Sequence, residues 1–85
     1  MQRYPSFELA LGKQIAIARE PTGLSQRALS ARLGRRINYI QLVESGHQPV
    51  TASGLVEIAL ALGTTGSELL ARAERIAALR PRREK

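Results

Sequence analysis

The sequence predicts a compact all-α domain of five short helices, and three observations lead to this fold class. Apolar residues recur at helical spacing in several stretches, and each stretch is bounded by a capping residue or by Gly and Pro. The chain has 85 residues, which is enough for one small domain. Hydrophobic residues make up 44% of it but aromatic residues only 4%. The core is therefore expected to consist mostly of Leu, Ile, Val and Ala, which suit closely packed helices.

The N-terminal helix is expected to run from Ser6, a good N-cap, to about Arg19. Its core-facing side chains recur at helical spacing, and they are Phe7, Leu11, Ile15 and Ala18. The sequence Pro21-Thr22-Gly23 then breaks the helix. Residues 1–5 are expected to form an N-terminal arm, and residues 6–80 one folded domain.

Two shorter helices follow, joined by a tight turn. Ser25 is the N-cap of the first, whose apolar face comprises Ala28, Leu29 and Leu33. Gly34 permits the left-handed backbone of a sharp turn. The second helix, roughly residues 36–45, directs Ile40 and Val43 inward, with Ile37 and Glu44 flanking them; Asn38, Gln41, Leu42 and Ser45 lie on the outward side. This arrangement is typical of a helix-turn-helix DNA reader, which we assign to residues 25–45.

The C-terminal half predicts two more helices. Thr51 is expected to cap a fourth helix that runs through Leu62. Thr65 and Glu68 form a capping box that opens the fifth, which extends to about residue 80. The apolar residues in register on this helix are Leu69, Ala73, Ile76 and Leu79. Pro81 ends it, and residues 81–85 are expected to form a basic disordered tail.

The fourth predicted helix is apolar on two faces. Its core stripe consists of Leu55, Ile58, Ala59 and Leu62, and Val56 and Leu60 lie well off this stripe. A helix of this kind usually has two burial surfaces. Two explanations remain open: a homodimer interface that includes Val56, Leu60 and Ile76, or a long fifth helix that covers Val56 and Leu60 within one monomer.

The charge distribution favours a polyanionic partner. The formal net charge is +6 and the isoelectric point is about 11.1. Residues 1–46 hold seven Lys and Arg against three Glu, and four of the last six residues are basic. Positive charge therefore gathers on the predicted reading unit and on the tail, as in proteins that bind nucleic acid. The alternative is a solvated basic surface without such a partner.

Residue usage excludes several classes of function. The chain has no Cys, no Asp and a single His, so an acid–base dyad, a disulfide or a metal cluster can hardly be assembled. We therefore expect no enzymatic activity, no cofactor and no metal. No apolar run reaches the ~18 residues that span a bilayer, and the start MQRYPSFE lacks a signal-peptide core. A cytoplasmic protein that associates with the nucleoid through DNA is the expectation.

An ordered set of residues extends over about residues 9–72. It comprises Arg19, Gly23-Leu24-Ser25-Gln26, Ala28-Leu29, Leu33-Gly34, Tyr39-Ile40, Glu44, Gly46, Pro49, Ile58-Ala59, Ala61-Leu62-Gly63 and Glu68-Leu69-Leu70. In this order and spacing the set resembles the Cro/CI-type (XRE-like) helix-turn-helix family of phage and bacterial regulators. The resemblance implies a lambda-repressor-like fold and binding to double-stranded DNA. It also implies that Arg19 and Glu44 form a partly buried salt bridge between the first and third helices.

The chemistry of the outward face predicts which side chains contact bases. Asn38 can pair bidentately with adenine, and Gln41 can do the same or reach a phosphate. Leu42 offers only an apolar contact, most usefully with a thymine methyl group, and Ile37 contributes similarly although its angle leaves it partly in the core. Arg36 can fork onto guanine or onto phosphates.

Phosphate contacts are expected around the two helix starts. Ser25 and Gln26 match residues that relatives use in this way, and further candidates are Arg27, Arg35, Tyr39 and His47. Arg35 and Arg36 depart from the family pattern, which has a small apolar residue and then a capping Ser or Thr. Because arginine caps poorly, the start of the helix at about residues 36–45, the recognition helix of the unit, is either less well fixed or stabilised by another group.

Two functions are consistent with these features. The first is a sequence-specific regulator, in the simplest case a homodimeric repressor that reads an inverted repeat through the major groove. The second is a protein-interaction module, such as an antitoxin subunit or a coregulator that contacts RNA polymerase. In the second case the apolar fourth helix would bind a different protein.

Overall fold

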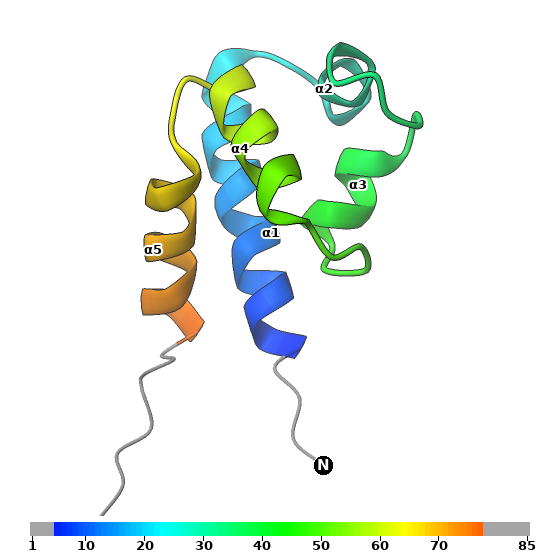
Figure 1. Cartoon of the computed structure of the whole chain (residues 1–85). Helices are drawn as coiled ribbons and strands as arrows, with labels where there is room; N and C mark the ends of the chain where they lie inside the picture. The colour runs from blue at the N-terminus through cyan, green and yellow to red at the C-terminus, as the bar shows by residue number, and fades with distance from the viewer. Residues whose placement is uncertain (1–4, 78–85) are drawn as a thin grey trace, which may run out of the picture.

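The computed structural model describes residues 5–77, which form five α-helices and one 3-10 turn (Figure 1). The elements are α1 (Pro5–Arg19), η1 (Glu20–Thr22), α2 (Gln26–Arg32), α3 (Tyr39–Glu44), α4 (Ala52–Ala61) and α5 (Gly66–Ala77). The prediction of a five-helix all-α domain is confirmed, with no strand in this part of the chain. Residues 1–4 of the expected N-terminal arm, Leu79, the end of the fifth helix at residue 80, and the tail at 81–85 lie outside the described residues. The helix α1 begins at Pro5, so Ser6 lies within it rather than at its N-cap.

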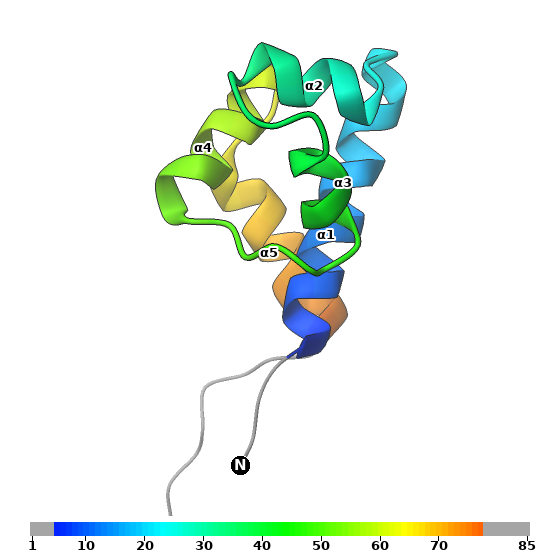
Figure 2. The ribbon, with the colours of Figure 1, turned by 90° about the vertical axis from the view of Figure 1, so that its right-hand side faces the viewer.

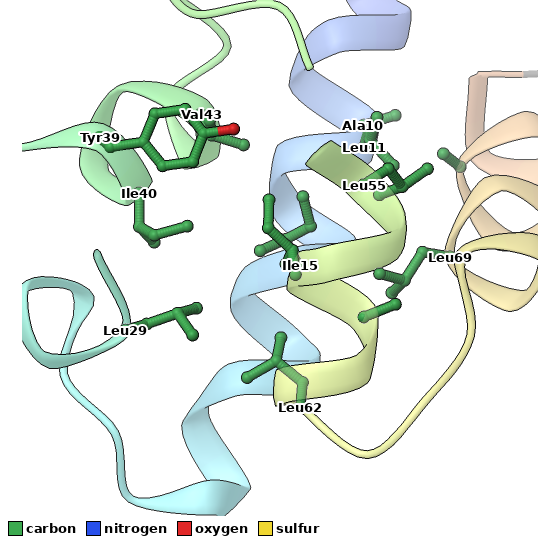
Figure 3. Close-up of a cluster of buried hydrophobic side chains, with 13 residues drawn as sticks. Ala10, Leu11, Ile15, Leu29, Tyr39, Ile40, Val43, Leu55, Leu62 and Leu69 are labelled. Atoms are coloured by element: carbon green, nitrogen blue, oxygen red, sulfur yellow. The ribbon is translucent and has the colours of Figure 1, made fainter. Parts of the chain in front are cut away.

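The long helix α1 packs against both α3 and α5. In Figure 1, α5 runs beside α1 in the opposite direction, and Figure 2 looks onto α3 in front of α1, with α2 above. The core lies between the five helices (Figure 3). Its buried residues are Ala10, Leu11, Ile15, Leu29, Tyr39, Ile40, Val43, Leu55, Ile58, Ala59, Leu62, Leu69 and Ala73. As the composition predicted, this core is aliphatic apart from one aromatic ring.

A glycine within α1 lets this helix lie directly against α3. A Cβ atom at Gly12 would lie 2.6 Å from the carbonyl oxygen of Glu44 and would also collide with the carbonyl oxygen of Val43. The two backbones therefore touch without an intervening side chain. Gly12 was not predicted to have a role, although an isolated glycine within a helical pattern is a signal for such close packing.

Some residues expected in the apolar faces are exposed. Ala28 is exposed on α2, where the buried positions are Leu29 and Ser30. Ile76 was expected in register with the core residues of α5 but is 60% exposed, because the core-facing side of this helix continues from Ala73 to Ala77 instead. A helical period allows the next core contact three or four residues further on, and it does not indicate which of the two positions is used.

The second apolar face of α4 remains uncovered. Val56 is 49% exposed and Leu60 is 69% exposed, so the alternative in which the fifth helix covers both within one monomer is wrong for residues 5–77. With Leu70 they line an apolar groove of about 410 Å³ between α4 and the start of α5. Ile76 lies elsewhere, in a second groove with Leu9. The three residues expected in one dimer interface therefore belong to two surfaces.

No single helix in the described part of the chain is long and apolar enough to cross a membrane. The helices α4 and α5 meet the length and composition required only when taken together, and they are bent by 107° relative to each other. Both contribute residues to the buried core, which accounts for their apolar composition.

Candidate nucleic-acid interface

The turn between α2 and α3 is held by backbone and capping hydrogen bonds. Ser25 is the N-cap of α2, and its Oγ accepts a 3.0 Å hydrogen bond from the backbone N–H of Ala28. Gly34 has a φ of 68°, which an L-residue with a side chain rarely adopts. The N–H of Arg35 then donates to the carbonyl oxygen of Ser30 at 2.9 Å. The chain leaves α2 through a fixed turn, as expected for this unit.

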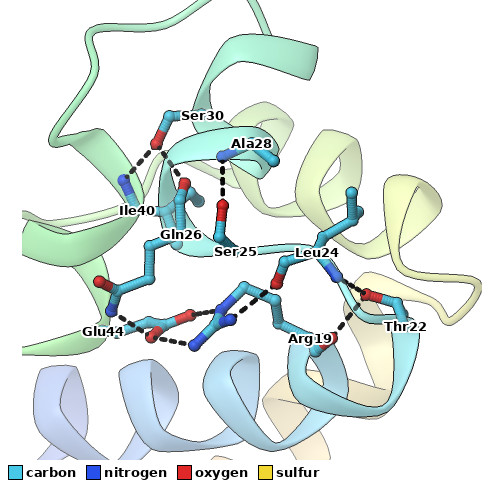
Figure 4. A network of polar contacts seen from close by, with 9 residues as sticks. All are labelled: Arg19, Thr22, Leu24, Ser25, Gln26, Ala28, Ser30, Ile40 and Glu44. Atoms are coloured by element: carbon cyan, nitrogen blue, oxygen red, sulfur yellow. Dashed lines mark hydrogen bonds and ion pairs between the residues drawn. The ribbon is translucent and has the colours of Figure 1, made fainter.

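The helix α3 is shorter than expected, because it begins at Tyr39 and not at Arg36. Asn38 occupies the N-cap position, but its side chain makes no capping hydrogen bond. The missing cap comes from α2: the Oγ of Ser30 accepts a 3.0 Å hydrogen bond from the backbone N–H of Ile40 (Figure 4). The same hydroxyl donates to the carbonyl oxygen of Gln26 at 2.9 Å.

Ser30 is thus the group that stabilises the start of the recognition helix in place of the usual capping residue. It is fully buried, and sequence reasoning missed it. A signal was present, since Ser30 is a small polar residue next to Leu29 on the core-facing side of a helix. A polar side chain in that position needs a buried hydrogen-bond partner.

Arg19 and Glu44 form an ion pair that joins α1 to α3 (Figure 4). Arg19 donates to both carboxylate oxygens of Glu44, from Nε at 2.7 Å and from Nη2 at 3.2 Å. Its Nη1 donates to the carbonyl oxygen of Leu24 at 2.8 Å. The hydrogen bond to Glu44 is the main reason that the pKa of Arg19 lies above its ordinary value. The side chains of the pair are only 12% and 7% exposed.

Gln26 belongs to the same network. Its Nε2 donates a 2.7 Å hydrogen bond to Oε1 of Glu44, which links α2 to α1 and α3. The side-chain amide is therefore already engaged by a protein carboxylate, and Gln26 is half-buried. Sequence reasoning expected a phosphate contact here and missed the link to Glu44.

The structure exposes most of the residues expected to contact bases. Asn38 and Gln41 are exposed, and the side-chain amide of Asn38 is not used as a cap. Ile37 was expected partly in the core but is 57% exposed, because the helix begins two residues after it and Ile37 lies in the preceding turn. Leu42 is half-buried, so its side chain is not fully outward.

The two arginines of the turn differ in their surroundings. The guanidinium carbon of Arg35 lies 4.5 Å from the centre of the Tyr39 ring, an arrangement that a cation–π interaction stabilises. Its Nη2 is also 3.7 Å from a carboxylate oxygen of Glu57. Arg36 is exposed and forms no ion pair with any residue in 5–77. Tyr39 is largely buried at 8% exposure, which leaves little of its surface for the expected phosphate contact.

The remaining candidates for phosphate contact lie on the surface. Ser25 and Arg27 are exposed at the start of α2. His47 is exposed in the loop after α3, with its Nδ1 2.8 Å from the hydroxyl oxygen of Ser45. Residues 5–77 contain no group of three or more His, Cys, Asp or Glu side chains placed to hold a metal ion.

Comparisons with solved structures agree with the five-helix arrangement described above. No curated protein sequence matches the chain significantly. A crystal structure of the clp gene regulator ClgR from Corynebacterium glutamicum superposes with a TM-score of 0.78 and 25% sequence identity, and the match covers 85% of this chain and 77% of that one. A second structure of ClgR gives a TM-score of 0.75 at 25% identity, with 81% and 88% covered.

A model of the helix-turn-helix domain family matches residues 10–72, which include all of α2, α3 and α4. The sequence resemblance predicted this assignment. The chain therefore belongs to the helix-turn-helix domain family of DNA-binding transcriptional regulators.

Proposed function

We propose that this protein is a sequence-specific regulator that binds an inverted repeat in double-stranded DNA as a homodimer, with α3 in the major groove. One observation carries the proposal: α3 is fixed by buried contacts, while Asn38 at its N-cap position and Gln41 within it stay exposed. Ser30, Glu44 and the close approach at Gly12 hold the helix on its inner side. A rigid support with free amide groups on its outer face suits the direct reading of base edges.

The proposed contacts follow from exposure and chemistry. Base edges are contacted by Asn38, Gln41, Ile37, Leu42 and Arg36. Phosphates are contacted by Ser25, Arg27, Arg35 and His47, with a smaller share for Gln26 and Tyr39 because their side chains are already engaged or buried. If a dimer neutralises about eight phosphates, the logarithm of the DNA-binding constant falls with the logarithm of the salt concentration with a slope of about −7.

Support for a homodimer comes from the uncovered face of α4. Val56, Leu60 and Leu70 line one apolar groove, which a second copy of the chain would remove from water. The interface also reaches Ile76 if it extends along α5 to the groove beside Leu9. Two copies related by a two-fold axis would place their recognition helices about one DNA turn apart, roughly 34–36 Å. Sedimentation tests this part, and a monomer at about ten micromolar contradicts it.

Selection from a random double-stranded DNA library, at near-physiological salt, tests the proposed function. The expected result is enrichment of one inverted repeat by the purified protein. Repression by occupying a promoter is the simplest consequence, in the cytoplasm and at the nucleoid. If the folded protein retains no motif, it does not read DNA sequence by itself.

The groove between α4 and α5 also favours a second candidate function. An exposed apolar groove of about 410 Å³ can accept a different protein, such as a toxin partner or RNA polymerase. A pull-down from the native host, with and without nuclease, separates the two. Partners retained after nuclease treatment favour the interaction module, and partners lost with the DNA favour the regulator.

A further inference from the structure

A serine and the single histidine of the chain form a hydrogen-bonded pair at the C-terminal end of α3. The Oγ of Ser45 lies 2.8 Å from Nδ1 of His47, and both residues are exposed. Under the proposed function His47 contacts a phosphate, whereas Ser45 has no role. Within residues 5–77 the other ring nitrogen of His47, Nε2, has no hydrogen-bond partner. Nε2 is therefore the ring atom that can reach a ligand.

The direction of this hydrogen bond follows from the carbonyl group of Leu42. Its oxygen accepts the backbone N–H groups of His47 at 2.9 Å and of Gln48 at 3.2 Å. A carbonyl oxygen has two lone pairs, so these two fixed donors use both. The hydroxyl of Ser45 lies 3.1 Å from the same oxygen, but its hydrogen can rotate toward Nδ1 of His47, which is closer. Neutral His47 therefore accepts at Nδ1 and carries its hydrogen on Nε2.

We infer that Ser45 is a positioning residue for His47, because its hydroxyl selects the tautomer in which a neutral imidazole donates from Nε2 to a DNA phosphate. This inference rests on the proposed function. Without the hydroxyl, the neutral ring can also carry its hydrogen on Nδ1, and Nε2 then presents a lone pair to an anionic oxygen. That arrangement is repulsive, so part of the neutral population loses the contact.

The same hydroxyl accommodates the charged form of His47. When the ring is protonated, Nδ1–H donates to Oγ of Ser45, and the hydroxyl hydrogen turns back to the carbonyl oxygen of Leu42. The charged ring, however, carries a hydrogen on both nitrogens with or without the serine. The effect of Ser45 on the phosphate contact is therefore confined to the neutral ring, and it disappears as the pH falls.

The ionisable groups around the pair leave this pH dependence to His47. The glycine before it lies against the backbone of α1, and the ionisable residues that flank this contact are Glu8 and Lys13. His47 forms no ion pair with Glu8, with Glu44 or with any other residue in 5–77. Among ordinary side chains of these types, only an imidazole changes its charge between about pH 5 and pH 8. The N-terminal amine also titrates near this range, and every variant shares it.

The pH dependence of DNA binding tests the inference. The probe is a labelled form of the duplex best retained in the random-library selection, and its affinity is measured by fluorescence anisotropy at constant ionic strength. Ser45→Ala is expected to weaken binding roughly threefold at about pH 8 and to have almost no effect at about pH 5.5. Because a phosphate favours the charged ring, wild-type binding strengthens as the pH falls, and His47→Gln is expected to lose this part.

Three variants separate positioning from stability. Ser45→Thr keeps a hydroxyl at the same place and is expected to behave as the wild type at both pH values. Ser53→Ala removes an exposed hydroxyl from α4 and is the matched control. In the His47→Gln background, Ser45→Ala is expected to change nothing, because the partner of the hydroxyl is absent. Thermal denaturation at both pH values shows whether each variant is folded.

The outcomes separate this inference from the proposed function. An equal loss of affinity for Ser45→Ala at both pH values, or a loss that persists in the His47→Gln background, overturns the inference, because Ser45 then acts through the structure of α3. No loss at either pH value also overturns it. These results leave sequence-specific binding intact. If the selection yields no motif, the proposed function fails, and a duplex of any fixed sequence still tests the pair, since a phosphate contact needs no particular base.

Discussion

Ser30→Ala tests how the recognition helix is held. The substitution removes the only side-chain acceptor that the structure provides for the backbone N–H of Ile40, and Ile40 itself is fully buried. Water cannot reach that amide, and a buried donor without a partner costs about 1–3 kcal/mol. The carbonyl oxygen of Gln26, which accepts from the Ser30 hydroxyl, keeps its ordinary helical partner. We therefore expect a loss of about 2 kcal/mol in the free energy of unfolding.

The measurement is chemical and thermal denaturation followed by circular dichroism. For a domain of this size, a loss of about 2 kcal/mol lowers Tm by about 8–16 °C. Ser25→Ala is the matched control, since that cap is exposed and its amide returns to water, at a cost of about 1 kcal/mol. A loss for Ser30→Ala no greater than for Ser25→Ala refutes the assignment of Ser30 as the buried cap of α3.

Three further predictions concern other contacts. Glu44→Ala leaves the guanidinium of Arg19 largely buried without its carboxylate, so denaturation is expected to show a loss of about 2–4 kcal/mol; a loss under about 1 kcal/mol contradicts this. Gly12→Ala forces α1 away from α3, and thermal denaturation is expected to show a loss of stability of about 1–3 kcal/mol. Helix propensity alone predicts a gain in stability, and such a gain would refute the close approach of the two backbones. Glu57→Gln removes the carboxylate near Arg35 and is expected to leave the stability unchanged. The affinity for a random-sequence duplex is expected to rise about twofold at low salt, as measured by fluorescence anisotropy. Unchanged affinity contradicts this prediction.

The fold could be predicted from the sequence because its signals are local. Ser25 and Thr51 cap their helices as expected, and each side chain accepts a hydrogen bond from the N–H three residues later. Apolar periodicity identified most of the core, including Ile15, Leu29 and Leu69. These features depend only on residues within one or two helical turns.

The features that were missed depend on contacts between helices. The start of α3 was placed three residues too early, because the cap of this helix is Ser30 on another helix, which accepts from the N–H of Ile40, the second residue of α3. The close packing at Gly12 depends on the position of α3, which no pattern within α1 reveals. The second role of Gln26 arises in the same way, since its partner Glu44 lies 18 positions away.

We propose above that the exposed outer face of α3 reads DNA sequence. The most direct test is to sequence the duplexes that the wild-type protein and Asn38→Ala each retain from one random library. Asn38 is exposed and caps nothing, so the variant is expected to fold normally. We predict an inverted repeat for the wild type, and for the variant the same repeat with specificity lost at one adenine of each half-site. The absence of a motif, or identical motifs for both proteins, contradicts the account.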